Sequence, residues 1–385
     1  MTARKIWTRD FILSFFAQVA FSSAFFSLIP TLPIYLSKSR MSEAEIGILI
    51  GAFSVSSLVF RPFVGRSLLQ ARERSFMVAG ATLFALSSAA YLIAQPFWPF
   101  LVLRIVHGAG LALFATASFT LVTRISPEAH RGQSLSFFYL AINIAFAIAP
   151  SLGMDLINRF GFPALFLFCL GLSLAALSIS LQLRGLDSDP PGEVLSKQPL
   201  FSREALPAGI MAFMGSFIWG AVTTFFSLYA LHQGVSNPGI FFAALAITLI
   251  LARGFGGKIL DRYAREKVLL PCIFAQIIGM GLLAFSSSLP RFILVAMIWG
   301  LGNAFYYPAL VAYSIDLAGS SRGPAIGTYM TLSDSGIGIG SVVMGIVLHL
   351  TNYPVMFLCL SLMGVIDLFY FYAFVLKRRR RYAHL

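Results

Sequence analysis

The sequence has 385 residues, of which 58% are hydrophobic and only 11% are charged, and its mean hydropathy is +0.83. Soluble domains carry about 25% charged residues, so this composition excludes a soluble globular protein and predicts a chain that lies mostly within a lipid bilayer. The net charge of +13 does not indicate nucleic-acid binding, because the basic residues gather in short segments between apolar runs, and no nucleic-acid partner is expected.

Twelve long apolar runs follow one another along the chain. A helix of about 20 apolar residues crosses a bilayer core of about 30 Å, and only helices satisfy their own backbone polar groups over such a length in lipid. The sequence therefore predicts an all-α integral membrane protein with twelve transmembrane helices. They are expected at residues 11–36, 46–69, 75–95, 98–123, 133–157, 163–183, 205–231, 239–260, 268–289, 292–317, 324–350 and 353–376.

Basic residues are distributed unevenly between the two sides of the predicted membrane. With both termini in the cytoplasm, the inside segments hold 21 Lys and Arg, and the outside loops hold four, Lys38, Arg40, Arg159 and Arg291. Cytoplasmic loops carry such an excess, so the sequence predicts a multi-pass protein of the bacterial inner membrane with both termini cytoplasmic. The basic tail, residues 377–381, is expected to anchor the chain at anionic lipid. The first apolar run is too long for a signal-peptide core, so no cleaved signal is expected.

The chain divides into two similar halves around one long polar linker. The expected boundaries are an N-terminal bundle at 1–183, a cytoplasmic linker at 184–204 and a C-terminal bundle with a basic tail at 205–385. Short stretches repeat 191 or 192 residues apart, with residues 61–65 matching 253–257 and residues 107–110 matching 299–302. Parallel repeats of this size predict two six-helix bundles with a site between them near the membrane midplane.

Two charged hairpins occupy equivalent places in the halves: GRSLLQARER at residues 65–74 and GKILDRYAREK at residues 257–267. They resemble the cytoplasmic loop signature of the major facilitator superfamily (MFS), which follows its second and eighth helices. With the twelve helices, the repeat and the linker, the resemblance covers the whole chain. It implies the MFS fold and similarity to the twelve-helix efflux and antiporter branch.

In that family the loop signature latches the cytoplasmic side through charge pairs. The second copy keeps the aspartate and the first lacks it, so we expect a stronger latch in the second half, with Asp316 paired to Arg253 or Arg262. The alternative is that these charges only set topology. The predicted cytoplasmic-gate residues are Gly65, Arg66, Gly257, Asp261, Arg262 and Asp316.

Polar residues inside apolar helices are candidates for function, because a charge at a helix centre costs about 2.5–3.5 kcal/mol on insertion scales. Asp334 lies twelve residues past Arg322, which is about 18 Å along a helix. It is the only acidic residue expected near mid-depth, since Asp155 and Asp367 fall nearer helix ends. Burial favours a neutral, protonated carboxyl, which suits a proton carrier, although a structural role is the alternative. Asn143 occupies the equivalent position in the first half. Its amide is expected either to bind substrate or to join two helices.

Arg104 opens the run RIVHGAG, which resembles the family's fourth-helix motif with His107 in place of the usual glutamine. In antiporters of the family this arginine is tied to proton coupling, so Arg104 and His107 join Asp334 as proton-coupling candidates. The fifth-helix run APSLG keeps Pro150 and Gly153 of the family's exporter signature and departs from it at two other glycines. This half-match favours export modestly.

Aromatic residues are abundant, with 38 Phe in the chain, and in this family the first, fourth, seventh and tenth helices surround the cavity. An aromatic cavity with few charges favours an amphipathic substrate over a sugar. The expected substrate-cavity residues are Asn143, Trp219, Asn303, Tyr306 and Tyr307.

No constellation of catalytic residues, phosphate loop or Cys/His metal cluster is recognisable, so neither an enzyme activity nor a cofactor or metal is expected. The predicted function is proton-coupled export of a small amphipathic molecule by a monomeric secondary transporter that uses alternating access. The expected partners are this substrate, protons and membrane lipid. The alternatives are an importer or facilitator of a small metabolite and a lipid or lysolipid translocator, and a non-transporting sensor is disfavoured because no further domain is recognisable.

Overall fold

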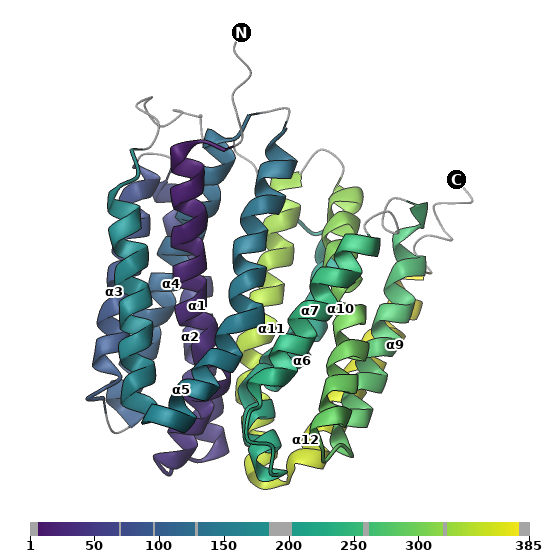
Figure 1. Ribbon diagram of the computed structural model, residues 1–385. Coiled ribbons are helices and arrows are strands. Elements are labelled where there is room, and N and C mark those ends of the chain that lie inside the picture. Colours follow the sequence, from purple (N-terminus) through teal and green to yellow (C-terminus); the bar gives the residue numbers. More distant parts are fainter. Residues whose placement is uncertain are drawn as a thin grey trace. The chain divides into compact units, whose positions relative to one another are not determined.

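The computed structural model describes residues 7–68, 71–94, 97–127, 130–184, 202–256, 262–318 and 322–376. Within these ranges the chain is almost entirely helical and forms no β-strand (Figure 1). The helices are α1 (Arg9–Lys38), α2 (Glu43–Ser67), α3 (Glu73–Ala90), α4 (Phe97–Ile125), α5 (Arg131–Leu181), α6 (Leu206–His232), α7 (Gly239–Gly256), α9 (Arg265–Ala284), α10 (Leu289–Ala318), α11 (Arg322–Leu350) and α12 (Tyr353–Tyr370), which continues into the π-helix η2 (Phe371–Leu376).

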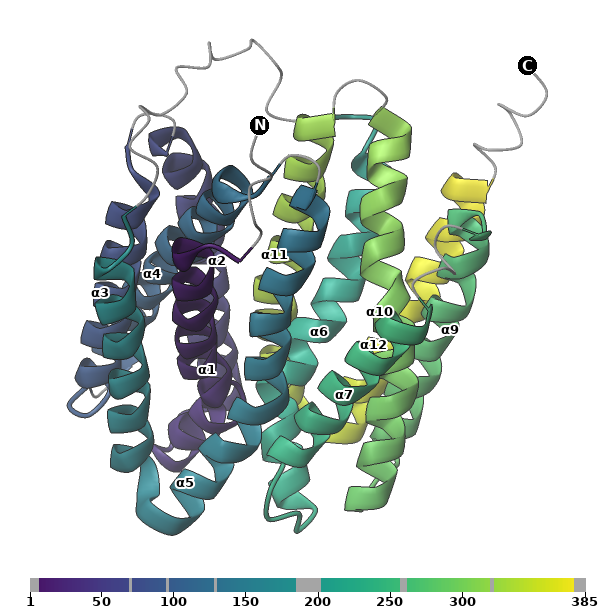
Figure 2. The same cartoon turned by 45° about the horizontal axis from the view of Figure 1, so that its top comes forward.

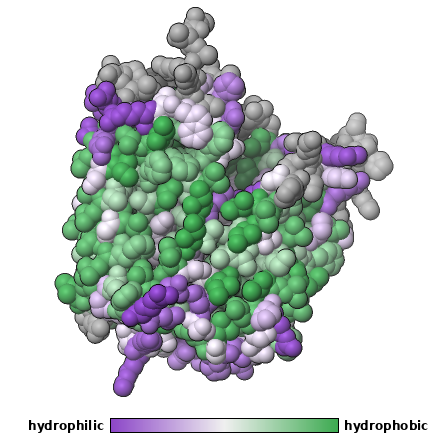
Figure 3. Space-filling view, viewed as in Figure 1, coloured by the Kyte–Doolittle hydropathy of each residue, from purple (hydrophilic) through white to green (hydrophobic). Residues whose placement is uncertain are grey.

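Nine helices in the described ranges are long and apolar enough to cross a membrane, and α7 contributes a shorter apolar helix, Gly239–Gly254. The face in Figure 3 is hydrophobic over the middle of the helices, and hydrophilic residues gather toward their ends. This is the surface expected of helices that contact lipid along their length and water at their ends. The prediction of an all-helical integral membrane protein is confirmed.

The long helix α5 is interrupted at Gly161, whose φ of 81° and ψ of 178° are not helical. Glycine adopts this left-handed region without the steric penalty that a Cβ brings. Pro163 follows in the first turn after the break, where its missing N–H costs little because the first N–H groups of a helix have no helical partner. The break falls between the predicted apolar runs 133–157 and 163–183.

The chain forms two compact units, one of Met1–Tyr35 with Ala52–Ser196 and the other of Leu36–Gly51 with Lys197–Leu385. In the first unit α3 packs against α4 and α5 (Figure 1, Figure 2). In the second unit α11 packs against α6, α10 against α7 and α9, and α12 against α9. The first turns of α2 belong to the second unit and the rest of α2 to the first.

Small residues and short hydrogen bonds hold α6 against α11. A methyl group at Gly336 or Gly340 would overlap the carbonyl oxygen of Phe213 or Phe217, so the backbones are in direct contact. Across the same interface, Thr224 Oγ1 lies 2.9 Å from Ser341 Oγ. Lipid tails are as apolar as Leu, so membrane helices associate through close packing and interhelical hydrogen bonds, and both are present here.

We therefore expect Gly340→Ala to destabilise the protein. Overpacking costs about 1–3 kcal/mol, which exceeds the helix propensity of about 1 kcal/mol that Ala gains over Gly. Gly327→Ala is the matched control, because Gly327 is exposed on the same helix and has no neighbour within 4 Å of an added Cβ. Thermal unfolding in detergent, followed through dye labelling of the buried Cys272, should show a lower Tm for Gly340→Ala alone. Equal Tm values for the two variants would contradict the packing argument.

Candidate functional site

A buried arginine lies inside the first unit, on α4. Arg104 is 4% exposed, and its Nη1 donates to the Tyr91 hydroxyl at 3.3 Å. Its guanidinium carbon lies 4.3 Å from the centre of the Phe53 ring. A cation over an aromatic face is attracted by the ring quadrupole, so the phenol and the ring together accommodate this cation inside the helix bundle.

His107 shares the phenol of Tyr91 with Arg104. Its Nδ1 lies 2.8 Å from the Tyr91 hydroxyl, and its buried Nε2 has no hydrogen-bond partner. Because the Tyr91 oxygen accepts from Arg104, its proton is free to point at Nδ1, which a neutral imidazole can accept. The two proton-coupling candidates of α4 are thus brought together, as their spacing on one helix face predicts.

The exporter-like residues of α5 pack against α1. Gly153 is buried, and a Cβ there would approach the Ser27 carbonyl oxygen to 2.8 Å. One turn before Gly153 on α5, the carbonyl of Ala149 accepts a hydrogen bond from Ser27 Oγ at 3.3 Å. Ala149 directly precedes the buried Pro150. Within the first unit this motif therefore serves close helix packing, which is the role its family counterpart implies.

A hydrogen-bonded polar cluster joins α6, α10 and α11 in the second unit. Ser216 Oγ lies 2.8 Å from Ser333 Oγ and donates to the Tyr307 hydroxyl at 3.5 Å. Asp334, the next residue on α11, is half-buried. The structure therefore places the predicted proton carrier beside a cluster that contains a predicted cavity residue.

The other predicted cavity residues have separate surroundings. Asn303 is buried and its amide donates to the carbonyl of Trp299 in its own helix at 2.8 Å. Trp219 packs against Trp299 with ring centres 5.1 Å apart. Asn143 lies half-buried on α5, in the other unit. Asn303 thus uses its donor group within its own helix, which favours a packing role over substrate binding.

Asp367 on α12 is a buried carboxyl that the sequence reasoning set aside. Its side chain is fully buried, and Oδ2 lies 2.6 Å from the Tyr306 hydroxyl. Distance from the helix end misled the prediction, because burial here depends on the packing of α12 against its neighbours. The signal was nevertheless present, since Asp367 is the only charged residue in α12.

Of the predicted cytoplasmic-gate residues, Gly257 and Asp261 lie outside the described residues. Arg66 and Arg262 are exposed, and an added Cβ at Gly65 would meet nothing within 4 Å. Asp316 forms an ion pair at 3.5 Å with Arg265, whereas Arg253 Nε donates to the carbonyl of Ala304 at 3.3 Å. The partner of Asp316 is thus neither of the two arginines predicted, because Arg265, the first residue of α9, reaches the last turn of α10.

In the first half a shorter and more buried ion pair occupies the corresponding place. Arg124 Nη1 lies 2.6 Å from Glu73 Oε1, and the Glu73 side chain is only 5% exposed, against 58% for that of Asp316. Glu73 begins α3, at the end of the first hairpin signature. The stronger latch expected in the second half stays a prediction, because Gly257 and Asp261 lie outside the described residues, and in the first half Glu73 supplies a carboxylate that the signature lacks.

We expect Glu73→Gln to destabilise the protein far more than Asp316→Asn. Breaking a buried ion pair by removing one partner costs up to about 3–5 kcal/mol, and an exposed pair contributes about 0–1 kcal/mol. Thermal unfolding can be followed through labelling of the buried Cys169 in the first unit and Cys272 in the second. If the Tm of Glu73→Gln is no lower than that of Asp316→Asn, burial does not determine which of the two ion pairs contributes more to stability.

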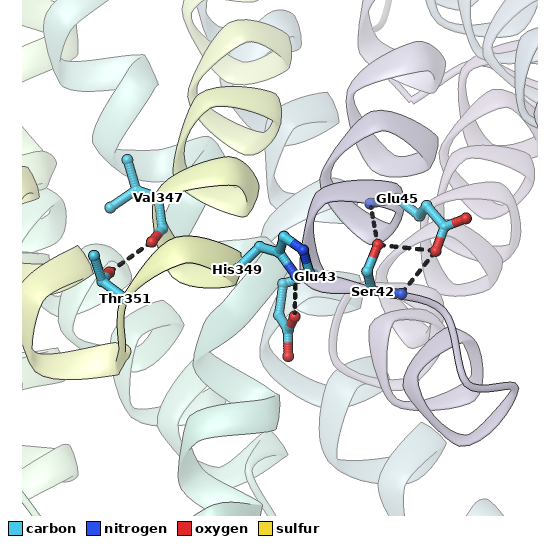
Figure 4. Close-up of polar contacts among 6 residues, drawn as sticks. All are labelled: Ser42, Glu43, Glu45, Val347, His349 and Thr351. Carbon is cyan, nitrogen blue, oxygen red and sulfur yellow. Dashed lines mark hydrogen bonds and ion pairs between the residues drawn. The ribbon is translucent and has the colours of Figure 1, made fainter.

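The start of α2 contacts the end of α11 within the second unit. Figure 4 shows His349 and Glu43 pointing toward one another, with His349 Nδ1 3.3 Å from Glu43 Oε2. Beside this pair, Ser42 Oγ and the Ser42 backbone N–H both donate to Glu45 Oε2, at 2.9 and 2.8 Å. The Glu45 N–H donates back to Ser42 Oγ at 3.3 Å, and this reciprocal cap fixes where α2 begins, so it sets the position of Glu43.

Long apolar helices that enclose a buried arginine, a buried carboxyl and hydrogen-bonded polar clusters define a polytopic membrane protein of the transporter class. The family model of the Major Facilitator Superfamily matches residues 14–263 and 208–384, and the chain belongs to this superfamily.

Its relatives include efflux transporters. The staphylopine export protein of Staphylococcus aureus (strain Mu50) is 24% identical over 344 residues, which cover 84% of this chain and 86% of that protein. Multidrug resistance protein 2 of Bacillus subtilis (strain 168) is 24% identical over 86% of each chain. The quinolone resistance protein NorA of Staphylococcus aureus is 23% identical over 88% of this chain and 90% of its own.

Solved transporters share the fold. A POT family transporter in complex with a thioalcohol-conjugated peptide gives a TM-score of 0.82 at 13% identity, covering 96% of both chains. The nucleoside transporter NupG gives a TM-score of 0.74 at 17% identity, covering 95% of this chain and 99% of its own. At these identities the likeness concerns the fold alone.

Proposed function

We propose that this protein is a proton-coupled secondary transporter that exports a small amphipathic molecule across the bacterial inner membrane. The direction of transport is inferred from relatives that are named for export or for drug resistance. Relatives named for staphylopine export, multidrug resistance and quinolone resistance match 84–88% of this chain. The exporter-like motif supports the same direction, because Gly153 and the carbonyl of Ala149, the neighbour of Pro150, contact Ser27 of α1.

Ionisable groups inside the spans support proton coupling. Asp334 lies half-buried on α11, and Arg104 and His107 lie buried on α4. Charges at such depth are costly and usually mark ion or proton pathways. In the proposed mechanism Asp334 binds and releases the proton, and Arg104 modulates it. The sequence contains no Walker-type phosphate loop, so a proton gradient rather than ATP is the expected energy source.

Alternating access would move one six-helix bundle, 1–183, against the other, 205–385. Twelve membrane-spanning segments result when α5 is counted as two helices on either side of Gly161, and when α3 and α7 are added to the nine helices that meet the length and hydropathy requirement. An even number of spans places both termini on one side, and the basic excess assigns that side to the cytoplasm.

The experiment is transport by inside-out membrane vesicles, in which export appears as uptake into the lumen. A panel of fluorescent amphipathic cations, anions and neutral dyes would be added with respiration switched on. Collapse of the pH gradient alone and of the voltage alone, by separate ionophores, identifies the coupling ion. The control is the same membrane with Asp334→Asn at equal protein level.

Respiration-dependent dye uptake that a pH-collapsing ionophore stops is the result expected for a proton-coupled exporter. Dye movement down its own concentration gradient in both directions, unaffected by the pH gradient, would instead indicate a facilitator. Accumulation by intact cells would indicate an importer. Movement of labelled lysolipid between leaflets, without dye transport, would indicate a lipid translocator, and each of these three outcomes would overturn the proposal.

A further inference from the structure

Asp367 is a carboxyl enclosed entirely by protein in the interior of the second unit. Its side chain is 0% exposed, Oδ2 lies 2.6 Å from the Tyr306 hydroxyl, and Oδ1 is buried without any hydrogen-bond partner. An ionised carboxylate has about four acceptor sites, and this one meets a single donor. Such an environment is poorly suited to a full negative charge.

The Tyr306 hydroxyl lies within hydrogen-bond distance of two acceptors at once. It is 2.6 Å from Asp367 Oδ2 and 2.7 Å from the carbonyl oxygen of Met211 on α6. A phenol carries one proton, and a hydrogen bond this short needs that proton close to the line between the two oxygens. With Asp367 ionised, one of the two short contacts would join two oxygens with no proton between them. With Asp367 protonated, its own proton serves Tyr306, and the Tyr306 proton serves Met211.

Within the part of the chain that the structure describes, no basic side chain forms an ion pair with Asp367. α6, α9 and α10 carry basic residues only in their first or last turns, and α12 carries none. The guanidinium of Arg253 on α7 contacts α10, where its Nε donates to the carbonyl of Ala304 at 3.3 Å. The titratable groups in electrostatic range of the pair are the phenols of Tyr307 and Tyr329. They are neutral donors that cannot balance a carboxylate charge.

We propose that Asp367 is a second proton-binding site, which holds a proton in the conformation seen here and releases it in another. Loss of that proton leaves the carboxylate as the stronger acceptor, so the Tyr306 hydroxyl turns from the Met211 carbonyl to Asp367. The hydrogen bond between α10 and α6 is then lost, and the bond between α10 and α12, which is present in both states, becomes stronger because its acceptor is charged. A single proton thereby decides whether Tyr306 hydrogen-bonds α10 to α6.

The neighbouring tyrosine connects this site to the polar cluster near Asp334. The Tyr306 and Tyr307 rings are nearly perpendicular, with centres 5.4 Å apart and an interplanar angle of 82°. Tyr307 contacts Ser216 of α6, which contacts Ser333 of α11. A shift of α10 relative to α6 would therefore change the hydrogen bonds of Ser333, the residue next to Asp334. This link to transport rests on the proposed function, whereas proton binding by Asp367 does not.

Infrared spectroscopy of the purified full-length protein in liposomes tests proton binding directly. A protonated carboxyl has a C=O stretch that a carboxylate lacks. We expect wild-type protein at neutral pH to show this band, to lose it as pH is raised, and to lack it in Asp367→Asn. The band should persist in Asp155→Asn, which removes an exposed acidic side chain. It should shift in frequency in Tyr306→Phe, which keeps the aromatic ring and removes the hydroxyl that contacts Asp367.

A wild-type spectrum without a band assignable to Asp367, or a band that persists at every pH at which the protein stays folded, would overturn the proposal. Transport gives the second arm, because Asp367→Asn cannot release a proton and should lose gradient-driven accumulation at a normal protein level. Full gradient-driven accumulation by that variant would remove Asp367 from coupling. If wild-type protein transports nothing in response to pH, the proposed function fails, and the infrared result still decides whether Asp367 binds a proton.

Discussion

Asp334→Asn is expected to abolish concentrative, gradient-driven transport while leaving substrate binding or exchange partly intact. A carboxylate couples two fluxes only if the proton and the substrate compete for it or share one of its states. Each pH unit of gradient offers about 1.4 kcal/mol per proton, and only a group that ionises during the cycle can use it. Asn keeps the size and hydrogen bonding of protonated Asp, so the variant resembles a carrier permanently loaded with its proton.

The comparison needs a measurement of each half of the cycle. Accumulation of dye against its gradient in energised inside-out vesicles reports coupling, and counterflow of labelled against unlabelled dye without a gradient reports substrate exchange. Asp155→Asn is the control, because Asp155 is exposed on α5 and should retain both activities. Asp334→Asn should lose the first and keep part of the second.

Full accumulation by Asp334→Asn at a normal protein level would remove Asp334 from the mechanism. His107 and Asp367 would then be the remaining titratable groups within the described helices that this structure singles out. Loss of both accumulation and counterflow would instead assign Asp334 to substrate binding or to structure, which is the alternative that its neighbours Ser333 and Ser335 leave open.

The helices were readable from the sequence because the bilayer imposes a length and a composition on each of them. The runs 98–123 and 292–317 differ from α4 and α10 by only a few residues at each end. The placement of Arg104 and His107 on one helix face was equally readable, since a spacing of three residues fixes a common face. In both cases the information is local in the chain.

The contacts between helices were not readable in this way. Glu73 pairs with Arg124, 51 residues away, and Asp367 meets Tyr306, 61 residues away. The helix that each side chain faces depends on packing, which the pattern of apolar residues within one helix does not encode. Depth along the helix therefore selected Asp334 as a candidate and passed over Asp367, whose surroundings come from α10 and α6.

Tethering Glu43→Cys to His349→Cys is expected to arrest transport. In the predicted topology these residues lie on the outer side of the membrane, at the start of α2 and the end of α11. Their side chains meet at 3.3 Å, and nearby a Cβ added at Gly345 would lie 2.6 Å from the Glu43 carbonyl oxygen. In an alternating-access cycle this contact must separate for substrate to leave outward, so a covalent link across it should hold the outer side shut.

The ion pair itself should contribute little. The Glu43 and His349 side chains are 41% and 51% exposed, and an exposed pair contributes about 0.2–1 kcal/mol. Glu43→Gln and His349→Gln should therefore transport nearly as well as wild type. The backbone approach of α2 to α11 is the stronger contact, because a Cβ at Gly47 would lie 2.5 Å from the Ser341 carbonyl oxygen.

The tether is best made with a flexible bifunctional thiol reagent that forms reducible disulfides, in a background without Cys169, Cys272 and Cys359. Each single-cysteine variant treated with the same reagent controls for modification alone and should remain active. Transport by the doubly substituted variant should disappear on treatment and return on reduction, because only the link has been removed. Undiminished transport by a fully cross-linked protein would mean that this contact stays closed throughout the cycle, and that substrate leaves by another route.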